Sequence, residues 1–241
     1  MIFVVSAPRS GLNWLRFCME HYLGVKTPGK DVLVGADSGL EPVFRRTHNA
    51  RKGARPDKGT PLLAVTQPDD RVLILLRDPL ETFVRAASGS YREFRGFIEN
   101  IRYFATCAAR HKHAAYYEEM TASPSAMLRT IDFLGVAPLE GRAMPCVEQL
   151  TADWASLGDM SRGSYSVRQA HGGGAMTRER PTDFRFHQQK LSEAEKQRVW
   201  RHLRRMLTRD EFALLARYLP ADGIAPAGPI ARVGDYISAW R

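Results

Sequence analysis

The chain has 241 residues, of which 44% are hydrophobic and 25% charged, and its formal net charge is +9. These values are typical of a globular protein, and we expect a single domain over residues 1–241. No apolar run is long enough to span a membrane, and three cysteines without metal-ligand spacing argue against a disulfide framework or a zinc site. Because a strand is predicted from residue 2 onwards, we expect no secretory signal segment and a cytoplasmic location.

Most of the positive charge is carried by arginine. The planar guanidinium group suits two-point contacts with phosphate and sulfate, so this charge is typical of a protein with a polyanionic partner or a phosphate-rich cofactor. Nucleic acid and acidic lipid are partners of this kind. A basic surface that contacts only water has the same composition, and charge alone does not distinguish these alternatives.

The beginning of the chain carries the most informative pattern. Ile2–Val5 is a short run of β-branched and aromatic residues, which predicts a buried strand that ends before Pro8. After Gly11 the apolar residues recur at helical spacing. A strand, a tight glycine turn and a helix direct backbone N–H groups towards an anion, and Arg9 and Ser10 add a cation and a hydroxyl. This segment therefore predicts a cradle for phosphate or sulfate.

Strands and helices alternate along the rest of the chain. Further strands are predicted over residues 42–48, 71–77 and 114–117, and helices over residues 80–88, 93–110 and 124–134. Capping boxes at Ser192–Glu195 and Thr208–Glu211 predict two more helices. This alternation predicts an α/β fold with a central, mostly parallel sheet flanked by helices.

Three segments are predicted to be loops: residues 25–40, 49–60 and 141–187. A loop as long as the third is usually functional. We expect its part from about residue 155 to residue 187 to be a mobile lid that orders over the ligand site and excludes water.

Residues with useful chemistry follow three of the predicted strands. Arg9–Asn13 follows the first strand, and Arg77 ends the third. Thr47 and His48 lie at the end of the second. Because the carboxyl ends of parallel strands lie at one edge of a sheet, we expect these residues to meet in one site.

The stretch Pro8–Trp14 lacks the G-K-[ST] ending of a triphosphatase loop and the three glycines of a dinucleotide fingerprint. It resembles the 5′-phosphosulfate loop of sulfotransferases, P-[KR]-S-G-x-T-W, which binds 3′-phosphoadenosine-5′-phosphosulfate (PAPS). Asn13 stands where the family usually has Thr, and this change leaves the backbone cradle intact. An ordinary turn between a strand and a helix is the alternative interpretation.

The segment Arg46–His48 resembles the K-T-H segment of the same family. The resemblance implies that His48 is the general base, which takes the proton of the acceptor hydroxyl as it attacks sulfur. Arg46 would neutralise charge on the departing phosphosulfate. A surface histidine without a catalytic role is the alternative, and Glu41 and Asp37 remain rival bases because some members use a carboxylate.

The segment Arg77–Pro79 resembles the 3′-phosphate segment of the family, R-[ND]-P followed by a helix, and it also matches a plain helix cap. The family usually has a Ser eight residues after this Arg, where the chain has Arg85. Either Arg85 contacts the 3′-phosphate, or Ser88 reaches it from the same helical face one turn later.

Two later stretches match the family less well. Residues 116–120 and 133–136 resemble its Y-E-D-L and F-L-G block, which implies that Tyr117 lies near the adenine, although a core tyrosine fits equally well. The late R-K-G segment has no clean match, and its candidates are Arg162–Gly163, Arg178 and Arg180.

The resemblance as a whole implies a P-loop NTPase-like sulfotransferase fold and transfer of a sulfuryl group from PAPS to a hydroxyl or amine of a small-molecule or glycan acceptor. The product is 3′,5′-diphosphoadenosine, and neither a metal nor a nucleic acid is expected. The implied catalytic residues are Arg9, Arg46 and His48. The implied donor-binding residues are Arg9, Ser10, Gly11, Leu12, Asn13, Trp14, Arg77, Arg85, Ser88 and Tyr117. A nucleotide kinase or other phosphotransferase, and a non-catalytic module that binds polyanions or nucleic acid, are the alternatives.

Overall fold

The computed structural model describes residues 1–29, 31–35, 39–54, 59–169 and 187–226, and over residues 162–169 it describes only the backbone. The elements follow in the order β1 (Ile2–Ser6), α1 (Leu12–Leu23), β2 (Arg45–Thr47), η1 (Ala50–Lys52), α2 (Leu62–Val65), β3 (Arg71–Leu76), α3 (Pro79–Ala86), α4 (Tyr91–Thr106), β4 (His111–Tyr116), α5 (Tyr117–Ala122), α6 (Pro124–Leu134), α7 (Val147–Gln169), η2 (His187–Lys190), α8 (Glu193–Met206), α9 (Arg209–Ala213) and η3 (Ala216–Tyr218).

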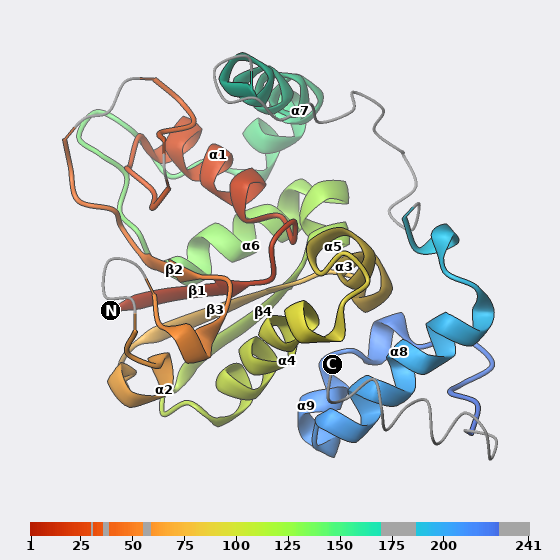
Figure 1. The fold of residues 1–241 in the computed structure, drawn as a ribbon. Coiled ribbons are helices and arrows are strands. Elements are labelled where there is room, and N and C mark those ends of the chain that lie inside the picture. Colours follow the sequence, from red (N-terminus) through yellow and green to blue (C-terminus); the bar gives the residue numbers. More distant parts are fainter. Residues whose placement is uncertain (30, 36–38, 55–58, 170–186, 227–241) are drawn as a thin grey trace.

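The four strands form one sheet in the order β2-β1-β3-β4, and every neighbouring pair is parallel (Figure 1). The central strands β1 and β3 are buried along almost their whole length. Helices cover both faces, which is why these strands are continuous apolar runs rather than alternating ones. The predicted α/β fold with a parallel sheet flanked by helices is confirmed.

Side chains that alternate along the strands divide the core into two clusters. Val4 and Leu73 pack with α1, α6 and α7 on one face of the sheet. Phe3 and Ile74 pack with α2, α4 and α8 on the other face (Figure 1). Each cluster joins residues that are far apart in the sequence. The position of the strands, and with it that of their carboxyl ends, therefore depends on the helices of both faces.

The connections from the two central strands run to opposite faces. The chain leaves β1 through α1 on the first face and leaves β3 through α3 and α4 on the second. The loops after β1 and β3 therefore diverge at the carboxyl edge of the sheet. Such a switch point is where open α/β sheets bind their ligands.

Local cap signals place the helices well. The side chain of Asp78 accepts from Leu80 N at 2.8 Å and starts α3 at Pro79. Both predicted capping boxes are present, at Ser192 and Thr208. These side chains satisfy backbone N–H groups that have no partner within the helix.

The expected irregular segment is partly wrong, because residues 147–169 form helix α7. The Gly and Ser residues of this stretch hide the helical period, but Leu150 and Leu157 are buried in the cluster around α1 and α6. The expected lid of residues 155–187 therefore begins inside a helix, and residues 170–186 lie outside the described residues.

No helix in the described part of the chain is long and apolar enough to cross a membrane.

Candidate functional site

The turn after β1 has the geometry of an anion cradle. Ser10 N donates to Ala7 O at 3.3 Å, and Arg9 takes a left-handed backbone conformation with φ 69°. For a residue with a Cβ this conformation costs about 1–2 kcal/mol, and such strain is often found at ligand sites. Gly11 caps α1 at φ 91° with no side-chain hydrogen bond to the cap. The first turn of α1 therefore directs backbone N–H groups to the carboxyl edge of the sheet.

The hydroxyl of Ser10 is the clearest sign of a missing partner. The Ser10 side chain is fully buried, and its Oγ has no hydrogen-bond partner. A buried polar group without a partner costs about 1–3 kcal/mol. A ligand oxygen bound in the cradle would satisfy it.

Tyr117 closes the cradle from α5. A Cβ on Gly11 would lie 2.6 Å from Cδ2 of the Tyr117 ring, so only glycine fits beneath this ring. The same ring also lies against Arg77, whose Cζ is 4.3 Å from the ring centroid. The tyrosine is thus held between the cradle and the end of β3 by packing and by a cation–π contact.

Arg77 joins the ends of β1 and β3. Its side chain is buried, and Nη1 donates to Arg9 O at 3.0 Å. Nη2 lies 3.7 Å from Oε2 of Glu81, which is fully buried on α3. Arg77, predicted to end the third strand, therefore lies against Arg9, predicted to follow the first, across the switch point.

Arg85 completes a group of three guanidinium groups. It is half-buried one turn beyond Glu81, and burial, followed by the positive charges of Arg77 and Arg9, lowers the pKa of the Arg85 guanidinium. The negative charge of Glu81 raises the pKa of Arg85 and so compensates part of the effect of the two other arginines. Arg85 thus lies near two other cations and a single carboxylate, and this excess of positive charge favours an anion with more than one negative charge.

Glu81 also fixes the segment that follows the undescribed residues 170–186. Its carboxylate lies 3.2 Å from His187 Nδ1 and accepts from Gln188 N at 2.8 Å. Nε2 of Gln188 donates to Asp78 Oδ2 at 3.3 Å. The η2 turn is therefore docked on the first turns of α3, beside the three arginines.

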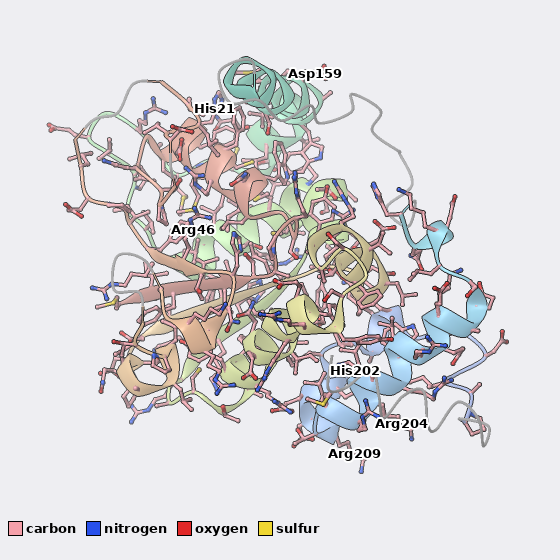
Figure 2. All side chains as sticks on the ribbon, in the orientation of Figure 1. His21, Arg46, Asp159, His202, Arg204 and Arg209 are labelled. Atoms are coloured by element: carbon pink, nitrogen blue, oxygen red, sulfur yellow. The ribbon has the colours of Figure 1, made fainter. Side chains whose placement is uncertain are left out.

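His48 lies on the other side of β1, at the end of β2. Its Nδ1 lies 2.9 Å from Ser6 O and 3.4 Å from Ser6 Oγ, and because a carbonyl only accepts, the shorter contact requires the proton on Nδ1. In the neutral ring Nε2 then holds the lone pair, and the His48 side chain is exposed. Nη1 of Arg46 lies 3.5 Å from Nε2, and Figure 2 shows Arg46 on the side of the sheet that faces α1. The tautomer is the one that a general base at Nε2 requires.

The remaining residues of the cradle turn their side chains towards the protein. Leu12 is buried in the core, and Asn13 Oδ1 accepts from Arg16 Nη1 at 3.3 Å. Trp14 Nε1 donates to Met120 O at 3.2 Å. These contacts fix the first turn of α1, so this stretch would meet an anion through its backbone.

Arg16 also holds the loop after α1. Its guanidinium pairs with buried Glu20 at 3.3 Å and donates to Thr27 Oγ1 at 2.8 Å and to Asp31 O at 2.7 Å. Glu20 in turn accepts from Val34 N at 3.0 Å. The loop expected at the surface is anchored by a buried ion pair next to Asn13.

Ser88 does not share the helical face of Arg85, and this expectation is wrong. Helix α3 ends at Ala86, and Ser88 is exposed beyond it with φ 49°. Among the rival bases, Glu41 is exposed, and Asp37 lies outside the described residues.

The late arginine candidates are not placed at the site. Arg178 and Arg180 lie outside the described residues, and only the backbone is described for Arg162 and Gly163, which belong to α7. Sequence reasoning also missed the buried residues that organise the site, above all Glu81. Glu81 stands three residues after Asp78, which is the spacing of a capping box. The sequence therefore indicates a role in the helix cap and gives no sign of the contact with Arg77.

Gly11 provides a test of the cradle. We expect Gly11→Ala to lower affinity for 3′,5′-diphosphoadenosine at least tenfold, because the new Cβ must displace the Tyr117 ring. Gly135→Ala is the matched control: Gly135 is also left-handed, at φ 65°, but its nearest neighbour is the end of the Arg71 side chain at the opposite sheet edge. Both variants should lose about 1–2 kcal/mol of stability. Calorimetric titration should show weaker binding in Gly11→Ala only, and equal binding in both would contradict the cradle.

No protein-family model matches the chain, and no curated protein or solved structure matches it either.

Proposed function

We propose that the chain is a PAPS-dependent sulfotransferase that acts on a hydroxyl or amine of a small molecule or glycan. The observation that carries the proposal is the convergence of three strand ends: the cradle after β1, the arginines after β3 and the exposed side chain of His48 after β2. An activated sulfuryl donor needs an anion cradle, cations for the leaving group and a base for the acceptor. The resemblance of the same three segments to sulfotransferase motifs agrees with this assignment.

The residues present fit a nucleotide with charge at both ends of its ribose. Ser10 Oγ, which is buried without a partner, and the N–H groups of the first turn of α1 would bind the 5′-phosphosulfate. Arg85 would bind the 3′-phosphate, and Arg77 would add its charge from beneath. Tyr117, held over Gly11, offers a ring face for the base.

The reaction follows from this arrangement. PAPS supplies an activated sulfuryl group, and the acceptor oxygen forms a bond to sulfur while the bond from sulfur to the bridging phosphate oxygen breaks. Nε2 of His48 takes the acceptor proton, and 3′,5′-diphosphoadenosine leaves with the bond electrons. Arg46, which lies 3.5 Å from Nε2, and Arg9 would stabilise the charge that develops on the leaving group. Positive charge from guanidinium groups removes the need for a metal ion.

A ligand-dependent melting experiment separates the proposal from its alternatives. We expect 3′,5′-diphosphoadenosine to raise the melting temperature, because a ligand at about 100 times its Kd adds about 2.7 kcal/mol of stability. ATP with magnesium should raise it more in a kinase, and a random oligonucleotide more in a nucleic-acid-binding protein. If the diphosphate has no effect while either of the others does, the proposal is wrong. Transfer of labelled sulfate from PAPS to a panel of glycans, amines and phenols then tests the reaction itself.

A further inference from the structure

The turn that presents His48 rests on α4 through one buried amide side chain. Asn100 is 1% exposed, and its Nδ2 donates to His48 O at 3.2 Å. Its Oδ1 accepts from Ala50 N at 2.9 Å. One donor and one acceptor on the turn therefore determine which way the amide faces. Each would lose a buried partner if the side chain were removed.

Gly96, one helical turn before Asn100, makes room for the same turn. A Cβ built on Gly96 would lie 3.3 Å from His48 O and 3.6 Å from Asn49 Nδ2. Glycine inside a helix costs about 1 kcal/mol relative to alanine. The close approach of the His48 carbonyl gives a physical reason for glycine here. Gly96 and Asn100 together form a seat on α4 for the end of β2.

The seat and β1 hold His48 at two points. Asn100 fixes the carbonyl of His48, and Ser6 O accepts the Nδ1 proton of its ring at 2.9 Å. The ring can keep this hydrogen bond only if the backbone of residue 48 stays at its present distance from β1. A shift of the turn would release Nδ1, and the neutral ring would then exchange between its two tautomers.

We propose that Asn100 is a positioning residue that keeps His48 in its Nδ1-protonated tautomer, in which the lone pair lies on Nε2, the atom 3.5 Å from Arg46 Nη1. The consequence for turnover rests on the proposed function, whereas the tautomer itself does not. Asn100 lies behind the turn, within α4, and acts on the reacting atoms only through His48.

The test is the ¹⁵N NMR spectrum of the His48 ring in the full chain, with His48→Asn identifying its signals. Asn100→Leu removes both hydrogen bonds, and Asn100→Asp keeps the one from Ala50 N but turns an oxygen towards His48 O. Gly96→Ala places a Cβ 3.3 Å from His48 O, so the turn must shift by a few tenths of an ångström, and it leaves Asn100 intact. Thr66→Val is the matched control: its buried hydroxyl contacts Leu62 O and Tyr103 Oη, both at 2.7 Å, and not the turn after β2.

At a pH where His48 is neutral, the wild type and Thr66→Val should show one protonated nitrogen, Nδ1, and one unprotonated nitrogen, Nε2. In the three α4 variants the two signals should move towards each other as the tautomers exchange. A single Nδ1-protonated tautomer in both Asn100→Leu and Gly96→Ala overturns the proposal.

Turnover provides the second readout. Misplacing a catalytic group by about 1 Å costs about 10²-fold, so kcat of sulfate transfer should fall by about that factor in the two Asn100 variants and by less in Gly96→Ala, with KM for PAPS unchanged. Unchanged kcat in variants whose tautomer has shifted overturns the catalytic part of the inference. If the wild type transfers no sulfate at all, the proposed function fails while the NMR result still decides the role of Asn100.

Discussion

His48→Asn should lower kcat for sulfate transfer by about 10²–10⁴-fold, the usual contribution of a general base, and leave affinity for 3′,5′-diphosphoadenosine unchanged. The amide nitrogen of Asn can occupy the place of Nδ1 and keep the hydrogen bond to Ser6 O, which is 2.9 Å long in the wild type. Nε2 has no counterpart in Asn. The substitution therefore removes the base with the least change to the turn after β2.

Two control variants distinguish the loss of the base from the loss of a nearby positive charge and from a general effect of replacing a histidine. His111→Gln changes an exposed histidine at the amino edge of the sheet and should have no effect on kcat. Arg46→Gln should lower kcat less than His48→Asn does, because its guanidinium lies 3.5 Å from Nε2 and would stabilise charge rather than accept the proton. Full turnover of His48→Asn on the true acceptor would show that another group is the base, and Glu41 would be examined next.

The sequence predicts the scaffold of the site well because its signals are local. The continuous apolar run of β3 and the Asp78-Pro79 cap depend on neighbouring residues alone, and the structure has both within one or two residues of the prediction. Parallel strands then bring Arg9 and Arg77 together by topology. Helix α7 was missed because Gly158 and nearby serines weaken the helical pattern, whereas its burial depends on α1 and α6.

The contacts that organise the site could not be predicted in the same way. Asn100 lies on a face of α4 rich in Phe and Ile, and no local pattern shows that it meets the turn after β2. The helical spacing of Arg85 and Ser88 predicts one shared face, but α3 ends at Ala86 and Ser88 lies beyond it with φ 49°. Pairings between distant segments depend on packing, and sequence spacing describes only neighbours along the chain.

Arg77, paired with Glu81, stabilises the fold and is also proposed to bind the ligand, so a single substitution of Arg77 would change stability and binding together. Both side chains are buried, with that of Arg77 6% exposed and that of Glu81 0%. Arg77 holds the end of β1 through Arg9 O, and Glu81 holds η2 through Gln188 N. Removing one member of a buried pair typically costs about 3–5 kcal/mol, because the other charge stays buried without compensation.

Arg77→Met should therefore lower the free energy of unfolding by about 3–5 kcal/mol and weaken binding of 3′,5′-diphosphoadenosine by about 10–100-fold, the usual value of a hydrogen bond to a charged group. Urea unfolding measures the first quantity, and calorimetric titration measures the second. Arg77→Lys keeps the charge but loses the planar contact with Tyr117, so it should bind with intermediate affinity.

The double variant Arg77→Met/Glu81→Gln separates the two roles. The neutral amide removes the uncompensated charge and keeps an oxygen for Gln188 N, so the double variant should be more stable than Arg77→Met alone. It should still bind the diphosphate about 10–100-fold more weakly than the wild type does, because the cation at position 77 is still absent. If it binds as tightly as the wild type, Arg77 has only a structural role. Arg9 and Arg85 would then have to hold the ligand without it, and the three strand ends would no longer form one donor site.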